Sequence, residues 1–159
     1  MNGVSRLSYT EDIVLLTLRC DTHANILIGD IFTEFAKEGI VIDMISQSAP
    51  QGSLMDISFT TFSSDMIKVF AVISRIRDDY KTIKLMVSTG NCKIQLFGEE
   101  MPQLNGVAAR AIMALVSNGI DIITITTSEV DISLVVSAAD SACAVEMLEK
   151  AFEIRASRV

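Results

Sequence analysis

At residues 34–42 the chain reads Glu34-Phe35-Ala36-Lys37-Glu38-Gly39-Ile40-Val41-Ile42, and at residues 114–122 it reads Ala114-Leu115-Val116-Ser117-Asn118-Gly119-Ile120-Asp121-Ile122. Both stretches contain a Gly-Ile step at the same place, 80 residues apart (119 − 39). Further on, Asp56-Ile57-Ser58-Phe59 matches Asp131-Ile132-Ser133-Leu134 at a separation of 75 residues (131 − 56). The separation between matching residues thus falls by five, which the turn-rich cluster at residues 49–53 explains as five extra residues in a hairpin of the first copy. We therefore interpret the chain as a duplication.

The composition excludes several classes of protein. The chain has 159 residues, half of them hydrophobic, with 13 basic and 20 acidic side chains and a formal net charge of −7. It is too apolar for a disordered chain, and its acidic balance disfavours a nucleic-acid-binding protein. No apolar run approaches the roughly 20 residues of a membrane-spanning helix, and the N-terminus does not resemble a signal peptide. We therefore expect a cytoplasmic protein with no nucleic-acid or membrane partner.

Few residues could carry catalysis or bind a metal. The cysteines Cys20, Cys92 and Cys143 are far apart in the sequence and have no spacing typical of a zinc site or a redox pair, so we expect buried, reduced thiols. His23 is the only histidine, and no nucleophile motif accompanies it. The sequence predicts no cofactor, no metal and no catalytic residue in this chain.

The first copy is predicted to contain four strands and two helices. Apolar and β-branched runs predict strands over residues 13–20, 41–47, 54–62 and 82–87. Apolar residues at helical spacing predict one helix over 27–37, ended by Gly39, and another over 66–76. The resulting order, βαββαβ, is that of the ferredoxin-like unit.

The second copy repeats this order but lacks its last strand. Strands are predicted over 93–97, 120–126 and 130–136, and helices over 107–116 and 140–152; the tail 153–159 is too short and basic to predict a strand. The alternating residues 3–9 form a spare strand, which we expect to complete the second sheet. The predicted fold class is α+β, with two interlocked ferredoxin-like βαββαβ modules over 10–89 and over 3–9 plus 90–155.

Four strings of residues carry a resemblance to a known family. They are Gly39–Gln47, Met55–Phe59, Gly106–Arg110 and Thr126–Ser133. These strings resemble the paired ACT modules of the C-terminal regulatory region of aspartate kinase, or its separate regulatory (beta) subunit, and the resemblance extends from Gly3 to Ile154. No Gly-rich phosphate loop or Lys-Phe-Gly-Gly start is present, so the catalytic domain has no counterpart in the sequence.

The resemblance implies a regulatory chain rather than an enzyme. Tandem ACT modules of this family are interlocked, form homodimers and bind lysine or threonine at module interfaces. The implied function is end-product feedback inhibition of aspartate kinase, an ATP-dependent phosphotransferase acting on the aspartate side-chain carboxylate. We expect the effector to tie two chains together and to favour the inhibited arrangement of the kinase, its implied partner.

The resemblance implies an effector site in the second module, in two groups of residues. One group opens the helix at residue 107, where unpaired N–H groups attract a carboxylate and Gly106 allows close approach of a ligand. The other group supplies hydroxyls and a carboxylate suited to an ammonium group. The predicted effector-binding residues are Met101, Asn105, Gly106, Val107, Ala108, Asp121, Ile122, Thr126, Thr127, Ser128 and Glu129. The alternative is a plain strand-to-helix connection capped by Asn105.

The first module departs from the family pattern. Where the family usually has an Asp-x-Pro-Gly turn, this sequence has His23-Ala24-Asn25-Ile26, which replaces glycine by a β-branched residue. Val41 stands where asparagine is common. The weaker candidates here are Asn25, Ile26, Asp43 and Gln47. We predict that the effector site of the first module is lost or altered and that the second is retained.

Two other functions share this topology. RNA-recognition modules stack bases on sheet aromatics beside basic residues, whereas the strands at 54–62 and 130–136 carry acids. A free-standing ACT amino-acid sensor that regulates another biosynthetic enzyme is the closer alternative. The identity of the protein that co-purifies with the chain distinguishes the two regulatory functions.

Overall fold

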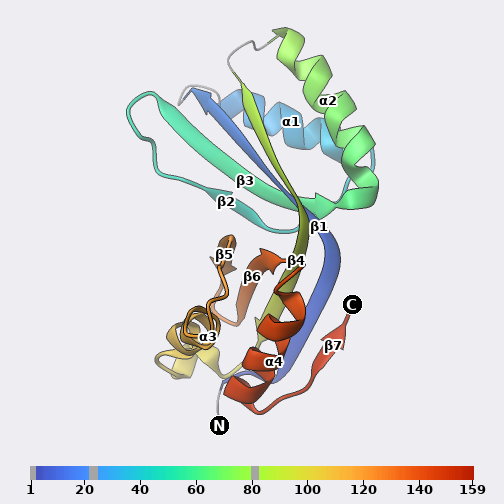
Figure 1. Ribbon diagram of the computed structural model, residues 1–159. Helices are drawn as coiled ribbons and strands as arrows, with labels where there is room; N and C mark the ends of the chain where they lie inside the picture. The colour runs from blue at the N-terminus through green and yellow to red at the C-terminus, as the bar shows by residue number, and fades with distance from the viewer. Residues whose placement is uncertain (1–2, 22–24, 80–82) are drawn as a thin grey trace. The chain divides into compact units, whose positions relative to one another are not determined.

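The computed structural model describes residues 3–21, 25–79 and 83–159, leaving out the side chains of 25–27 and 78–79 (Figure 1). The chain divides into two compact units. Unit 1 contains the N-terminal segment up to Asp12 together with Gly90–Val159, and unit 2 contains Ile13–Thr89. Two long strands, β1 (Arg6–Asp21) and β4 (Lys84–Phe97), each contribute residues to both units.

Unit 2 is a four-stranded sheet with two helices on one face. Its strand order is β2-β3-β1-β4, and β3 pairs antiparallel with β1 from Ile13↔Phe62 to Asp21↔Leu54. The other elements are β2 (Ile45–Gln47), β3 (Leu54–Phe62), the 3₁₀ turn η1 (Ser63–Asp65), α1 (Asn25–Lys37) and α2 (Met66–Asp79). Alternate residues of β1 and β3 pack against the apolar faces of both helices. This agrees with an apolar residue at every second position of a strand and about every 3.6 positions of a helix.

Unit 1 has the same layers. Its sheet has the order β1-β4-β6-β5, with β7 pairing parallel to the outer side of β1 at Leu7–Tyr9. Its elements are η2 (Met101–Gln103), α3 (Val107–Val116), β5 (Thr124–Thr127), β6 (Asp131–Ser137), α4 (Ser141–Phe152) and β7 (Ala156–Arg158). Both helices bury one residue every turn, at 107, 111 and 115 in α3 and at 144, 148 and 152 in α4.

The N-terminal residues belong to the core of unit 1. Val4 and Leu7 are buried in the same apolar cluster as Ile94, Leu134 and Leu148. The N–H of Ser5 donates to the carbonyl of Phe97 at 2.8 Å, which ties this segment to β4. The carbonyl of Gly3 passes so close to Gly98 that a Cβ at residue 98 would collide with it.

Most of the predicted elements are confirmed, and so is the α+β class. The helix predicted over 107–116 and the strand over 54–62 have the predicted bounds. The prediction that the tail forms no strand is wrong, because β7 pairs with β1. The sequence also predicted separate strands on either side of residues 10–12 and on either side of residues 88–92. This prediction is wrong, because β1 and β4 run through these residues without interruption.

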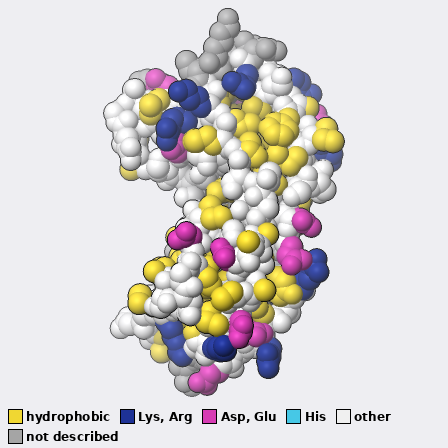
Figure 2. Space-filling view, in the orientation of Figure 1, with side chains coloured by type: hydrophobic (Ala, Val, Ile, Leu, Met, Phe, Trp, Pro, Cys, Tyr) yellow, Lys and Arg dark blue, Asp and Glu magenta, His cyan; other side chains and the backbone are white. Residues whose placement is uncertain are grey.

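Two further predictions about side chains and spans can be compared with the structure. Cys20 and Cys92 are buried as expected, but Cys143 is exposed on α4, so the expectation of three buried thiols is wrong. Within the described residues, no helix is both long enough and apolar enough to cross a membrane. Hydrophobic side chains do reach the surface, as the yellow areas of Figure 2 show.

Candidate functional site

Unit 1 brings the loop before α3 and the β5–β6 hairpin to the same end of its sheet. Strand β6 is antiparallel to both β4 and β5, so β4 and β5 end on the same side. The N–H of Gly98, directly after β4, donates to the carbonyl of Val130 in the hairpin at 2.9 Å. The first of the predicted residues in this loop, Met101, is buried and anchors the turn to the core. Sequence reasoning placed both segments in the site, and the structure shows that they are neighbours in the sheet.

The start of α3 is shaped by a left-handed glycine. Gly106 has φ 90° and ψ 6°, a conformation that L side chains rarely adopt, and its carbonyl accepts the N–H of Arg110 at 2.9 Å. No side-chain hydrogen bond caps this helix end in the described part of the chain. The prediction that Asn105 caps the helix is therefore wrong, whereas the alternative of a plain strand-to-helix connection stays open. The first amides of α3, including those of Val107 and Ala108, have no partner within the helix, and a helix start of this kind can bind an anion.

The hairpin presents its polar side chains outward. The N–H of Ser128 donates to the carbonyl of Asp131 at 2.8 Å, which closes the turn. The hydroxyl of Ser128 accepts the N–H of Val130 at 3.3 Å, so this hydroxyl also holds the turn. Thr127, Ser128 and Glu129 are exposed, while Thr126 is partly buried. The exposed hydroxyls and the Glu129 carboxylate can accept hydrogen bonds from an ammonium group.

A polar cluster beside the hairpin was missed by sequence reasoning. The amide nitrogen of Gln95 donates to one carboxylate oxygen of Asp131 at 2.5 Å, and the hydroxyl of Ser133 donates to the other at 2.9 Å. These residues lie on the sheet face opposite the helices, because they alternate along β4 and β6 with core residues such as Ile94 and Leu134. Period-2 alternation along the two strands was the signal that could have found them. These two hydrogen bonds fix the side chain of Asp131, the first residue of β6.

Asp121 and Ile122 do not join the helix-start group within unit 1. They precede β5 and therefore lie at the opposite end of this edge strand from the hairpin. Six residues separate Asp121 from Thr127 (127 − 121), or about 20 Å of extended strand. Asp121 is exposed, whereas Ile122 packs against the apolar core of the unit.

The candidates in unit 2 come from the corresponding segments of its sheet. Asn25 and Ile26 form the first residues of α1, and their side chains lie outside the described residues, as do His23 and Ala24 altogether. Asp43 and Gln47 are exposed on or beside the edge strand β2, where the N–H of Asp43 donates to the carbonyl of Thr60 at 3.1 Å. Strand β3 is antiparallel to both β1 and β2, so Gln47 at the end of β2 lies at the same end of the sheet as the end of β1, after which α1 begins, whereas Asp43 precedes β2 at the other end.

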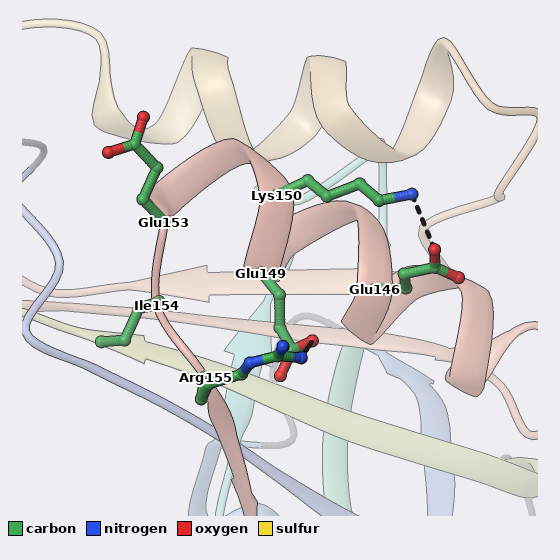
Figure 3. Close-up of a pocket in the computed structure, with 6 residues that line it drawn as sticks. All are labelled: Glu146, Glu149, Lys150, Glu153, Ile154 and Arg155. Atoms are coloured by element: carbon green, nitrogen blue, oxygen red, sulfur yellow. Dashed lines mark hydrogen bonds and ion pairs between the residues drawn. The ribbon is translucent and has the colours of Figure 1, made fainter.

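One hollow in the described part of unit 1 lies away from the predicted site. It has a volume of about 360 Å³ and surrounds the last turn of α4 (Figure 3). Lys150 pairs with Glu146 at 2.6 Å, and Arg155 pairs with Glu149 at 3.3 Å, so most charges there are already matched. Glu149 also accepts the N–H of Ala156 at 2.7 Å, which links α4 to β7. These contacts stabilise the C-terminal turn and do not form a cluster of convergent free groups.

Neither metal binding nor thiol chemistry is favoured by the described residues. Among them, no three His, Cys, Asp or Glu side chains are grouped so as to hold a metal ion. Burial, reinforced by the nearby Glu11 carboxylate, raises the pKa of Cys92 to about 11. Burial likewise raises the pKa of Cys20. These two thiols therefore stay protonated and unreactive near neutral pH.

A segment of unit 1 matches a known protein family. Residues 94–152 match the family model for the ACT domain, and this range begins in β4 and ends with α4. The chain therefore carries an ACT domain, the class of small regulatory module that the resemblance indicated.

The whole chain matches aspartate kinases. It is 30% identical over 156 residues to the aspartokinase of Bacillus sp. (strain MGA3), an alignment that covers 98% of this chain and 38% of that protein. The regulatory subunit of aspartate kinase from Thermus thermophilus has the same fold, with a TM-score of 0.85 and 23% identity over 94% of this chain and 99% of that one. A chain from the structure of aspartokinase alpha and beta subunits matches with a TM-score of 0.84 and 25% identity, covering 95% of this chain and 99% of that one.

The predicted resemblance to the regulatory region of aspartate kinase is thus confirmed. The chain spans 38% of the length of the Bacillus relative, and its matches among solved structures include proteins described as regulatory subunits. These matches are consistent with the regulatory part of an aspartate kinase.

Proposed function

We propose that this chain is the amino-acid-binding, allosteric part of an aspartate kinase and that it acts in the cytoplasm. The observation that carries the proposal is the match along 98% of the chain to an aspartokinase, of which it spans 38%. The chain then works with a kinase catalytic domain or subunit, and its ligand is an end product of the aspartate family, lysine or threonine. Binding of the end product lowers the activity of the kinase.

Each unit corresponds to one ACT module in this proposal. The family match covers 94–152 in unit 1, and unit 2 repeats the same order of strands and helices. The division into residues 1–12 plus 90–159 and residues 13–89 supports an interlocked pair. The two modules could then not be separated by a single cut between them.

The effector site lies at the start of α3 and the β5–β6 hairpin of unit 1. The free amides after Gly106 hold the carboxylate of the amino acid, and the exposed hairpin hydroxyls with Glu129 hold its ammonium or a basic side chain. Asp121 and Ile122 lie at the other end of the edge strand, so they serve the same kind of site from a second chain. A homodimer formed through the modules would complete such a site.

Unit 2 does not keep an equivalent site. In the repeat, Gly106 corresponds to residue 26 (106 − 80), which is isoleucine. Helix α1 already includes this residue, whereas α3 begins only after the left-handed glycine. The open turn that admits a ligand in unit 1 is therefore replaced by helix.

Inhibition of the kinase results from a difference in effector affinity between two arrangements of the assembly, one in which the chains are docked and one in which they are separated. An effector that bridges two chains binds the docked arrangement more tightly than the separated one, and it shifts the population by that difference in affinity. By linkage, docking of the chains raises the affinity for the effector by the same factor.

A thermal-shift screen of the twenty amino acids, followed by calorimetry, tests the proposal. We expect lysine or threonine to raise the melting temperature, with one molecule bound per chain, and to strengthen dimerisation in ultracentrifugation. Glu129→Ala should weaken lysine binding more than threonine binding, while Glu146→Ala, an exposed control on α4, should change neither. Absence of any amino-acid binding by the dimer would contradict the proposed function, and two molecules per chain would contradict the loss of the unit 2 site.

A further inference from the structure

The chain crosses between the two units in β1 and again in β4, and each of these strands has a residue with left-handed backbone at the boundary. In β1 this residue is Asp12, with φ 58°, and in β4 it is Gly90, with φ 68°. Unit 1 ends at Asp12 on one strand and begins again at Gly90 on the other. The division into units and the backbone angles are independent observations, and they point to the same two residues.

The sheet is also narrowest at this point. Pairing of β1 with β7 ends at Tyr9, and its pairing with β3 begins at Ile13. On the other crossing strand, pairing with β6 begins at Asn91. Between these limits, the strand order places β1 and β4 next to each other, and the carbonyl of Gly90 also accepts the N–H of Ala138 at 2.8 Å. Two-stranded ribbons twist more readily than wide sheets.

The boundary residues belong to neither of the two apolar core clusters. Glu11, Asp12, Thr89 and Gly90 are exposed, whereas the side chains immediately beyond them, such as Ile13 and Cys92, are buried. The two core clusters are separate: one includes residues up to Tyr9 and from Cys92 onward, and the other runs from Val14 to Leu85.

Asp12 is the more informative of the two residues. A non-glycine residue with positive φ is strained, and such strain persists only where the surrounding structure requires it. Asp and Asn tolerate this conformation better than other side chains, which suits a position that alternates between left-handed and extended backbone. Gly90 can adopt both conformations without strain.

We propose that Asp12 and Gly90 form a two-strand hinge about which units 1 and 2 change their relative orientation. The rotation consists of a change in φ and ψ at these residues, while the pairing of β1 with β3 and of β4 with β6 is kept. This inference is independent of the identity of the effector and of the kinase.

Distances between spin labels on the full chain test the hinge. One label is placed on the natural Cys143, exposed in unit 1, and the other on Ser74→Cys, exposed on α2 in unit 2; Cys20 and Cys92 are buried and are not labelled. A pair within unit 1, Cys143 with Ser117→Cys, gives the reference width. We expect the distance distribution between units to be wider than this reference.

Backbone variants then assign the motion to these residues. Gly90→Val should shift or narrow the distribution between units, because valine strongly disfavours positive φ and no atom lies within 4 Å of the added Cβ. Asp12→Gly should widen it without loss of the folded state. Gly119→Val is the matched control, since Gly119 also has positive φ (72°) and open space but lies within unit 1; it should lower the melting temperature and leave the distribution unchanged. A distribution as narrow as the reference and unmoved by Asp12→Gly would overturn the hinge, even if Gly90→Val fails to fold.

Discussion

Two substitutions in the single strand β1 should destabilise different units. Leu7 is 1% exposed and belongs to the core of unit 1, and Leu16 is 0% exposed and belongs to the core of unit 2, although only nine residues separate them (16 − 7). Replacing a fully buried leucine by alanine loses the transfer free energy of the removed carbons and leaves a cavity, which together cost about 2–5 kcal/mol. Each loss should be felt in the unit that contains the cavity.

Native-state hydrogen exchange measures this locally. We expect Leu7→Ala to speed the exchange of amides in α4 by about 30-fold or more, since about 2 kcal/mol corresponds to that factor, with a much smaller effect in α2. Leu16→Ala should give the opposite pattern. Leu54→Ala, at a position 47% exposed in β3, is the control and should change the free energy of unfolding by less than about 0.5 kcal/mol.

The result that would refute the reasoning is uniform acceleration. If Leu7→Ala and Leu16→Ala both speed exchange equally in α2 and α4, the chain unfolds as one cooperative body and the division into two units has no energetic meaning. If Leu7→Ala acts mainly on α2, the N-terminal strand does not stabilise unit 1 at all.

Two further predictions concern single residues. Gly98→Ala should destabilise the chain by about 1–3 kcal/mol in urea unfolding, because its Cβ would meet the backbone of Gly3 rather than a flexible side chain; Gly29→Ala, in a helix with open space around it, should be neutral or stabilising. In the folded chain at pH 8, a thiol reagent should modify Cys143 quickly and the two buried cysteines slowly, since the pKa of Cys92 is raised to about 11; equal rates for all three would contradict the burial.

The helices could be predicted closely because each has one apolar face and a clear stop. Helix α3 buries residues 107, 111 and 115, and Gly119 ends its last turn with φ 72°, so both its pattern and its end are visible in the sequence. The continuity of β1 and β4 could not be predicted in this way. The polar residues around Asp12 and Gly90 were interpreted as breaks between strands. In the structure, Asp12 and Gly90 adopt left-handed backbone conformations and the strands continue through them.

The candidate site was predicted in part for similar reasons. The left-handed turn at Gly106 and the polar hairpin are local features, which short sequence patterns describe well. The Gln95–Asp131–Ser133 cluster depends on the register of β4 against β6, and Asp121 lies at the far end of β5 because of the strand order. Such relations are set by pairing between distant segments, and the local pattern of residues contains little information on them.

The two copies of the repeat have kept one end of their first helix and changed the other. After both helices, a left-handed glycine ends the turn: Gly39 donates its N–H to Ala36, and Gly119 donates its N–H to Val116. At the opposite end, α3 starts at residue 107, which corresponds to 27 (107 − 80), but α1 starts two residues earlier.

Two extra residues displace the first free amides by about 3 Å along the helix axis and turn them by about 200° around it. A carboxylate held by the start of α3 would therefore miss the corresponding amides of α1, whatever the side chain of the ligand. The altered residue is Ile26 in place of glycine, and a β-branched side chain cannot hold the positive φ that the turn at Gly106 requires. Restoring the turn would thus need glycine at 26 before any change of ligand-contacting side chains. Calorimetry on Ile26→Gly, compared with the unaltered chain, should show whether a second amino acid per chain can then bind.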